Sequence, residues 1–266
     1  MMILSFVFAS LIGVSLGLIG AGGSILTVPV LVYFAGIEPA TATAYSLFIV
    51  GTTSLFGGSI SVIEKKIDFK TGAAFLAVSF ITVFIARRFF LPALPQHWFS
   101  LGSFEITKSK GLMLLFATFM LAAGMAMMRP EKKSNNDVAS VNYVVVILSG
   151  IAVGILAGLV GAGGGFLIIP ALILFAGLDT KIAINTSLLI IAINSLAGFA
   201  GDLENGLHPD WHFLIPFSLL ALAGIAIGKV IARKADGVKL KRGFGVFVLF
   251  LAAMILFEEF KTLGTI

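Results

Sequence analysis

The chain contains no cysteine and few charged residues. The lack of cysteine excludes disulfides, thiolate metal sites, thiol catalysis and iron–sulfur clusters. Only 12% of its 266 residues are charged, whereas a soluble domain carries about a quarter. Because 59% of the residues are hydrophobic, the composition is that of an integral membrane protein.

Apolar stretches long enough to cross a bilayer, which takes about 20 helical residues, recur along the sequence. The N-terminal stretch has no basic region and no cleavage site, so we interpret it as a retained span and not a signal peptide. The sequence predicts spans at about 2–19, 42–63, 70–90, 111–128, 141–160, 182–200, 211–232 and 244–260, with shorter apolar pieces at 25–36 and 166–177.

The sequence pI is about 9.5, but the basic residues lie in short loops beside the spans. Lys and Arg at such positions are topology signals. We therefore expect contact with the lipid bilayer and no binding of nucleic acid.

The sequence contains an internal repeat. Residues 13–36 align with residues 154–177 without gaps, with 13 identities in 24 positions, at an offset of 141. Further matches at this offset, or one residue more, are Glu38 with Asp179, Ser46 with Ser187, Ser54 with Ser195, Asp68 with Asp210 and Arg87 with Lys229. This predicts repeat 1 at 1–130, a polar linker at 131–140 and repeat 2 at 141–266.

The two repeats are expected to have opposite orientations. Each contains a long span, a short piece of about 12 residues and three further spans. The short piece is too short to cross alone, and it crosses only if the glycines before it are extended; otherwise it forms a re-entrant pair with the first span. Either way the number of crossings per repeat is odd. A cytoplasmic linker would place 13 of the 18 basic residues inside, as the positive-inside rule requires.

Each repeat carries a glycine run, GAGGS at 20–24 and GAGGG at 161–165. Irregular backbone at membrane depth must face protein or a water-filled cavity. A short helix that starts after such a break presents free N–H groups, which attract anions. We therefore expect the two runs to meet near the bilayer centre and to form a substrate site. The candidate residues are Gly22, Gly23, Ser24, Gly163, Gly164 and Gly165.

Another interpretation is that these glycines only allow close helix packing. Nucleotide binding is poorly supported, since no lysine follows either run as a P-loop requires, and Ile25 and Phe166 occupy the last glycine position of a dinucleotide motif.

The span after each short piece supplies polar side chains. Ser46 and Thr53 share one helical face, as do Ser187 and Asn194, and Asn185 lies beside them in sequence. These neutral groups are candidate ligands for an oxyanion. Alternatively, the hydroxyls only bond to carbonyls of the preceding turn.

Three charged positions have two interpretations each. Glu38 and Asp179 precede long helices and are predicted N-caps; a role in coupling transport to an ion is the alternative. Arg87 either extends to the membrane surface or points inward to meet an anion, so it is included among the substrate-binding candidates.

The duplicated G-x-x-x-G-x-x-GAGG-x5-P pattern at 13–29 and 154–170, the AG-hydrophobic-acidic turn and the Ser-Leu pair that follows resemble the TauE/SafE sulfite exporter family. The resemblance covers almost the whole chain. It implies an all-helical membrane permease that moves sulfite, organosulfonates or related sulfur anions, usually outward, across the bacterial cytoplasmic membrane.

We therefore predict a secondary transporter that works by alternating access. A passive anion channel and a non-transporting scaffold are the alternatives. No catalytic constellation, metal site or cofactor is predicted, and a homodimer is compatible with the sequence.

Overall fold

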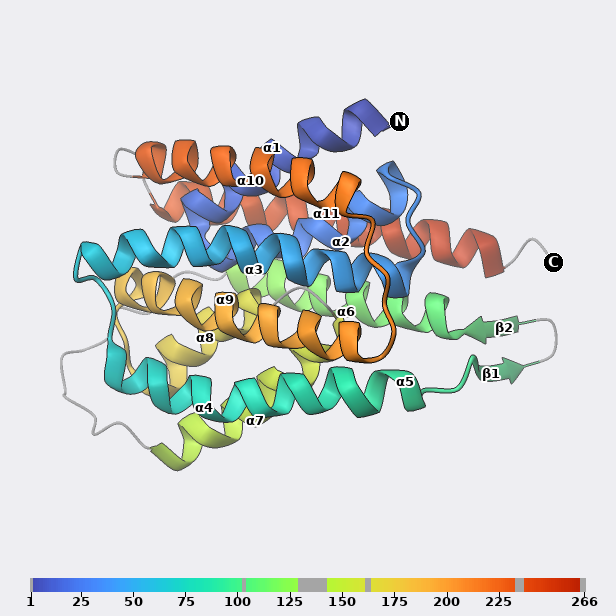
Figure 1. Ribbon diagram of the computed structural model, residues 1–266, viewed down its shortest axis with the longest axis horizontal. Helices are drawn as coiled ribbons and strands as arrows, with labels where there is room; N and C mark the ends of the chain where they lie inside the picture. Colours follow the sequence, from blue (N-terminus) through green and yellow to red (C-terminus); the bar gives the residue numbers. More distant parts are fainter. Residues whose placement is uncertain (1, 102–103, 129–142, 161–163, 233–236, 264–266) are drawn as a thin grey trace.

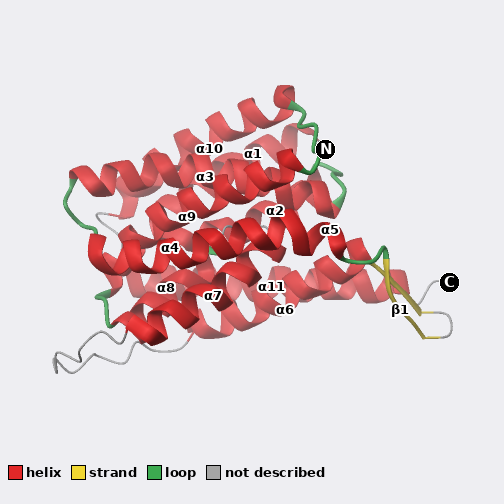
Figure 2. Cartoon of the chain, turned by 60° about the horizontal axis from the view of Figure 1, so that its bottom comes forward, coloured by secondary structure: helices red, strands yellow, loops and turns green. Residues whose placement is uncertain are grey.

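The computed structural model describes residues 2–101, 104–128, 143–160, 164–232 and 237–263. Long helices run side by side along one axis (Figure 1). The described strands form one antiparallel hairpin at an end of the bundle (Figure 2). The fold is all-α, as predicted, and the linker at 131–140 lies outside the described residues.

The first half contains α1 (Met2–Ile19), the 3-10 helix η1 (Gly20–Leu26), α2 (Thr27–Pro29), the π-helix η2 (Val30–Phe34), α3 (Pro39–Ile63), α4 (Phe69–Ile85), the π-helix η3 (Ala86–Phe90), α5 (Leu91–Ala93), β1 (His97–Leu101), β2 (Phe104–Thr107) and α6 (Lys108–Met128). The hairpin was not predicted, although aromatic and β-branched residues such as those of β2 favour strands.

The second half contains α7 (Tyr143–Val160), α8 (Gly165–Ala176), α9 (Thr180–Glu204), α10 (Trp211–Ala232) and α11 (Gly237–Leu263). The predicted span at 211–232 matches α10, whereas α9 continues four residues beyond the predicted 200. Within the described residues, the helices long and apolar enough to cross a membrane include Pro39–Ile63, Phe69–Ala93, Lys181–Glu204 and Trp211–Ala232.

The predicted N-caps are confirmed. Glu38 accepts a hydrogen bond from Thr41 N at 3.0 Å, and Asp179 accepts one from Lys181 N at 2.9 Å. Burial raises the pKa of the Glu38 carboxyl, but hydrogen bonds from Ser109 and Thr41 outweigh this and hold the pKa below its ordinary value. These caps fix the starts of α3 and α9.

The first glycine run turns the chain back on itself. η1 is a 3-10 helix and not an extended segment, so the alternative in which the first short piece crosses the membrane is not adopted. The rings of Phe8 and Phe34 lie 4.5 Å apart, which places the end of η2 beside the start of α1. The segment from α1 to η2 is therefore a re-entrant hairpin.

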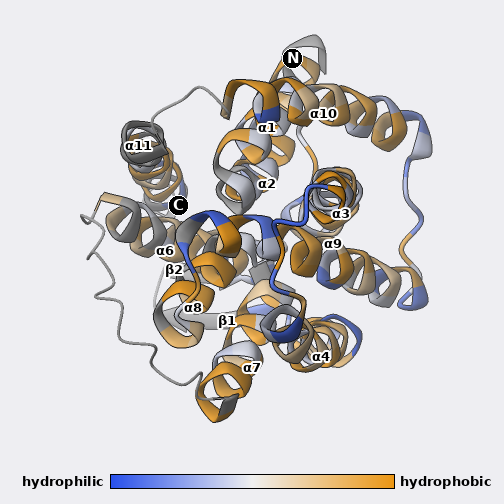
Figure 3. Ribbon diagram, turned by 90° about the vertical axis from the view of Figure 1, so that its left-hand side faces the viewer, coloured by the Kyte–Doolittle hydropathy of each residue, from blue (hydrophilic) through white to orange (hydrophobic). Residues whose placement is uncertain are grey.

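The long helices pack in pairs, and each pair joins a helix of the first half to a helix of the second half. α1 packs on α10, α7 on α4, α3 on α9, and α6 on α11. An end-on view shows α1 and α10 on one side of the bundle and α4 and α7 on the opposite side (Figure 3). Each first helix of a half thus packs against a helix of the other half.

Glycines make this exchange possible. A Cβ on Gly154 of α7 would lie 2.9 Å from the carbonyl oxygen of Ser79 on α4. A Cβ on Gly13 of α1 would collide with the carbonyl oxygen of Ala221 on α10. Gly13 and Gly154 are equivalent at the 141 offset, and Ser79 and Ala221 at 142. Equivalent glycines therefore bring equivalent helices into backbone contact.

We predict that Gly154→Ala lowers the free energy of unfolding in detergent by about 1–3 kcal/mol, because the added methyl overpacks the α7–α4 contact. The matched control is Gly243→Ala on α11, where a Cβ meets no atom within 4 Å. Thermal unfolding of the purified protein measures both. Equal or higher stability of Gly154→Ala would contradict the close contact.

Candidate functional site

α3 and α9 pack against each other in opposite directions. A Cβ on Gly198 would lie 2.9 Å from Leu47 Cδ1, and a Cβ on Gly57 would lie 3.5 Å from Leu188 Cδ1. Leu47, near the start of α3, thus meets Gly198, near the end of α9. Leu47 and Leu188 are equivalent at the 141 offset, and so are Gly57 and Gly198. The two contacts are therefore related by the repeat.

A pair of hydrogen bonds repeats the same relation. Asp68 N donates to Thr186 Oγ1 at 3.1 Å, and Asp210 N donates to Tyr45 Oη at 2.7 Å. Asp68 and Asp210 precede α4 and α10, whereas Thr186 and Tyr45 belong to α9 and α3. The start of one helix in each half is therefore bonded to a helix of the other half.

Arg87 forms the first of two polar clusters between the halves. Its side chain is fully buried, and Nη1 lies 3.2 Å from Asp202 Oδ2 and donates to Thr43 Oγ1 at 3.1 Å. Asn205 Nδ2 donates to the Arg87 carbonyl oxygen at 3.1 Å. We call these four residues the arginine cluster. Arg87 lies in the π-helix η3, an irregularity that is frequent at functional sites.

The Arg87 guanidinium is only partly satisfied. Its Nε and Nη2 have no hydrogen-bond partner among the described residues, although all of the side chain is buried. These two nitrogens form one edge of the planar guanidinium, and such an edge binds oxyanions with two parallel hydrogen bonds. Arg87 therefore points inward, and the alternative in which it extends to the membrane surface is wrong.

Lys229 forms the second cluster, together with Ser61 and Asn185. Lys229 Nζ donates to Ser61 Oγ at 2.9 Å and also to the carbonyl oxygen of Gly57. Ser61 Oγ lies 2.7 Å from Asn185 Oδ1. We call this the lysine cluster. Ser61 is equivalent to Asp202 at the 141 offset, as Lys229 is to Arg87 at 142, so the two clusters occupy corresponding places.

The clusters lie near opposite ends of α3. Thr43 and Ser61 are 18 positions apart on this helix, a distance of about 27 Å at 1.5 Å per residue. Such a separation is close to the thickness of a hydrocarbon core, about 30 Å. The buried Arg87 therefore lies toward one face of the bundle and the partly buried Lys229 toward the other.

Buried polar side chains lie between the two clusters. Asn194 Nδ2 donates to Ser79 Oγ at 2.8 Å, while Asn194 Oδ1 has no partner among the described residues. The same holds for the hydroxyls of Ser54 and Ser195, which are completely buried. Ser54 shares a helical face with Gly51, whose Cβ would lie 3.3 Å from Leu196 N. The tight α3–α9 contact thus contains unsatisfied neutral groups.

The expected meeting of the two glycine runs stays a prediction, because residues 161–163 of the second run lie outside the described residues. Gly17, just before the first run, packs against Lys229 N, at the level of the lysine cluster. Gly158, just before the second run, packs against Ala86, next to Arg87. The first run, in η1, also contacts α8, the helix that follows the second run.

Both runs do interrupt the helices. Gly22, Gly23 and Ser24 lie in η1, where Ser24 is buried. Gly164 is the N-cap of α8 with φ of 67°, and α8 starts at Gly165. Gly163 lies outside the described residues.

The predicted polar residues have different surroundings. Thr53 Oγ1 donates to Ile49 O at 2.5 Å and Ser187 Oγ to Ile184 O at 2.8 Å, as in the alternative of bonding within the helix. Ser46 is buried, and its hydroxyl has no partner among the described residues. Asn185 belongs to the lysine cluster and Asn194 to the row between the clusters. The described residues of this set therefore lie in different surroundings.

Sequence reasoning missed Asp202, Thr43, Ser61 and Ser79. Asp202 fell outside the predicted span, which ended at about 200, whereas α9 continues to Glu204. The alignment of Arg87 with Lys229 carried a signal, since two cations at equivalent positions in spans predict equivalent partners.

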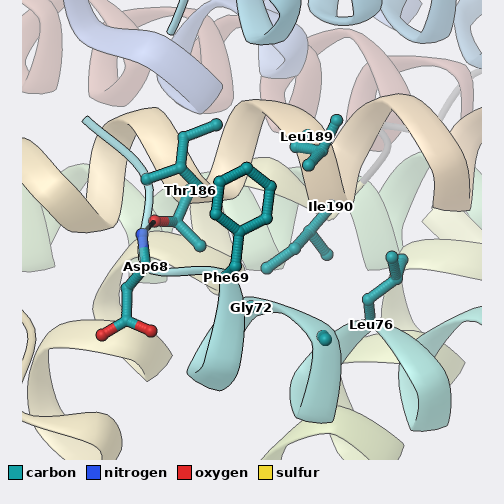
Figure 4. Close-up of a pocket in the computed structure, with 9 residues that line it drawn as sticks. Asp68, Phe69, Gly72, Leu76, Thr186, Leu189 and Ile190 are labelled. Atoms are coloured by element: carbon teal, nitrogen blue, oxygen red, sulfur yellow. Dashed lines mark hydrogen bonds between the residues drawn. The ribbon is translucent and has the colours of Figure 1, made fainter. Parts of the chain in front are cut away.

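A cavity of about 140 Å³, whose lining includes no residue of either cluster, lies between the start of α4 and the first half of α9. Phe69, Leu76 and Ile190 project into this region (Figure 4). Its lining is mainly apolar, so it offers little to bind an anion.

A buried arginine and a partly buried lysine inside a multi-pass helical bundle are typical of membrane transporters. The family model of sulfite exporter TauE/SafE matches residues 5–255. The chain belongs to the TauE/SafE family and is a multi-pass transporter of the cell membrane.

The curated relatives cover nearly the whole chain. A probable membrane transporter protein of Xylella fastidiosa is 28% identical, over 95% of this chain and 94% of the relative. Bacillus subtilis YunE, also named a probable membrane transporter protein, is 28% identical over 96% and 98%. Methanocaldococcus jannaschii MJ0441, named likewise, is 26% identical over 91% of each chain.

We predict that Arg87→Gln costs about 3–5 kcal/mol of unfolding free energy, because it leaves the Asp202 carboxylate buried without its cation. The double variant Arg87→Gln with Asp202→Asn removes both charges and should recover a large part of this loss. Unfolding of the two single variants and the double variant measures the coupling. Additive effects would show that the ion pair has no energetic role.

Proposed function

We propose that the chain is a secondary carrier that moves a small sulfur oxyanion, such as sulfite or an organosulfonate, by alternating access. The observation that carries this proposal is the buried Arg87 guanidinium, whose Nε–Nη2 edge has no partner in the part of the chain that the structure describes. Because an arginine cannot lose its charge to relieve burial, this edge is suited to a desolvated anion. The family description supports sulfite or a related anion as the cargo.

The paired contacts support two inverted halves. The antiparallel α3 and α9, the exchanged helix pairs and the equivalent hydrogen bonds are what a pseudo-two-fold axis in the membrane plane would produce. Inverted repeats of this kind underlie alternating access in many secondary transporters. Thr53 and Asn194 are equivalent at the 141 offset, and the antiparallel register of α3 and α9 brings these two positions to the same level. In this arrangement the axis therefore passes close to them.

In the proposed cycle each cluster acts as a gate. Opening toward one face separates Arg87 from Asp202 and Thr43, while Lys229 stays bonded to Ser61. Opening toward the other face breaks the lysine cluster instead. The neutral groups between them, Ser54, Ser195 and Asn194, would offer hydrogen bonds to an anion without a charge that would hold it too strongly.

Counterflow tests transport and substrate together. Proteoliposomes loaded with unlabelled sulfite should transiently accumulate radiolabelled sulfite from outside. Arg87→Gln should raise the half-saturating concentration about tenfold or more, equal to about 1.4 kcal/mol of lost binding. The matched control is Arg88→Gln, since Arg88 is partly exposed and pairs with Glu204 at 3.3 Å.

Each other result has a definite meaning. Flux without accumulation would indicate a channel. No flux of sulfite, sulfate, thiosulfate or sulfoacetate by a folded protein would favour a scaffold. An equal loss in both arginine variants would remove Arg87 from the site.

The absence of cysteine allows a direct test of alternating access. We predict that Ser54→Cys reacts with a membrane-impermeant thiol reagent from either face, and that sulfite on one face alone raises labelling from one side while lowering it from the other. Ser59→Cys, at an exposed position of α3, serves as the control and should show no such reciprocal change. Labelling from both sides that rises or falls together would indicate a continuous pore.

A further inference from the structure

Asp202 is a buried carboxylate that lies close to one aqueous end of the bundle. It is 8% exposed, whereas the side chain of Glu204, two residues later, is 56% exposed. α9 ends at Glu204, and most of segment 205–210 after it is exposed. A proton from this side therefore reaches Asp202 after about one helical turn, roughly 5 Å.

The charged surroundings of Asp202 are simple. Arg87 of η3 faces its Oδ2 at 3.2 Å, and Thr43 of α3 bonds to the same guanidinium nitrogen. The other titratable groups on η3, the end of α9 and the following loop are exposed or partly exposed, namely Arg88, Glu204, His208 and Asp210. The buried pair of Arg87 and Asp202 therefore has no net charge when both are ionised.

An anion on the free edge of Arg87 changes this balance. With Asp202 ionised, one buried guanidinium would face two negative groups, and the cluster would carry a net charge of −1. Uncompensated charge inside a membrane protein is costly. Protonation of Asp202 restores neutrality and releases Arg87 from its carboxylate partner.

We propose that Asp202 is the proton-binding residue of this carrier, and that one proton moves in the same direction as each monovalent anion. This inference rests on the anion transport proposed above. The bound proton converts the Asp202 carboxylate to a neutral carboxylic acid, and its release lets Asp202 pair with Arg87 again. Transport is then electroneutral, and the combined gradients of anion and proton set its direction.

The other half has no corresponding acid. Ser61 stands at the position equivalent to Asp202, and it cannot gain or lose a proton in the physiological range. Proton binding is therefore assigned to the arginine cluster alone.

Methanesulfonate is a suitable probe because its single charge does not titrate. In wild-type proteoliposomes an inward pH gradient, acid outside, should drive accumulation of labelled methanesulfonate, while a membrane potential should have little effect. Asp202→Asn should reverse this pattern, so that potential drives uptake and the pH gradient does not. The matched control Glu204→Gln, next to Asp202 but in the exposed pair with Arg88, should behave like wild type.

Counterflow separates this proposal from the proposed function. Asp202→Asn should still exchange internal for external methanesulfonate, since exchange needs no net proton movement. If exchange occurs but the wild type responds to potential and not to the pH gradient, the assignment of Asp202 is overturned. If neither sulfite nor methanesulfonate exchanges in the wild type, the proposed function fails.

A measurement without transport tests Asp202 by itself. Difference infrared spectra of the purified protein should show a protonated carboxyl band when methanesulfonate is added at constant pH, with one proton taken up per bound anion. Asp202→Asn should lose this band and this proton uptake, while Glu204→Gln retains both. A band of full size in Asp202→Asn would place the proton elsewhere.

Discussion

Close backbone contact between helices is the constraint on which this fold depends. Lipid chains are as apolar as leucine, so membrane helices associate through tight packing and hydrogen bonds and not through the hydrophobic effect. Gly17 and Gly158 occupy equivalent positions on α1 and α7, and each allows its helix to approach the backbone of a helix from the other half. The same closeness brings polar groups of α3, α9, α4 and α10 within hydrogen-bonding distance.

The buried charges become tolerable because of this packing. Arg87 is fully enclosed, and it is held by a carboxylate and a hydroxyl from two different helices. Lys229 reaches a serine hydroxyl and a backbone carbonyl in the corresponding place. Two related positions thus differ in chemistry, since Arg87 has a carboxylate partner and the acceptors of Lys229 include a serine hydroxyl and a backbone carbonyl. A duplicated framework has in this way acquired two ends with different properties.

Local sequence signals predicted the elements, but not the depth at which they lie. Helix breaks at Gly20 and Gly164 follow from the conformational freedom of glycine, and both adopt positive φ. The depth of each break in the bundle depends on how its whole hairpin packs, which no local pattern encodes. Asp202 was missed for a related reason, since a few polar residues at the end of an apolar run resemble a loop until the packing of α9 against α4 is known. The duplication was the most informative signal, because it related Arg87 to Lys229 before any contact was visible.

The exchange of helix partners has a consequence for how the protein is made. α1 finds its packing surface on α10, and α4 finds its surface on α7, so neither half contains the contacts needed to fold as a separate domain. During synthesis the first five segments enter the membrane with glycine faces still uncovered, and they remain so until the second half emerges from the ribosome. Assembly of the native bundle is therefore a late event, completed when nearly the whole chain has been inserted.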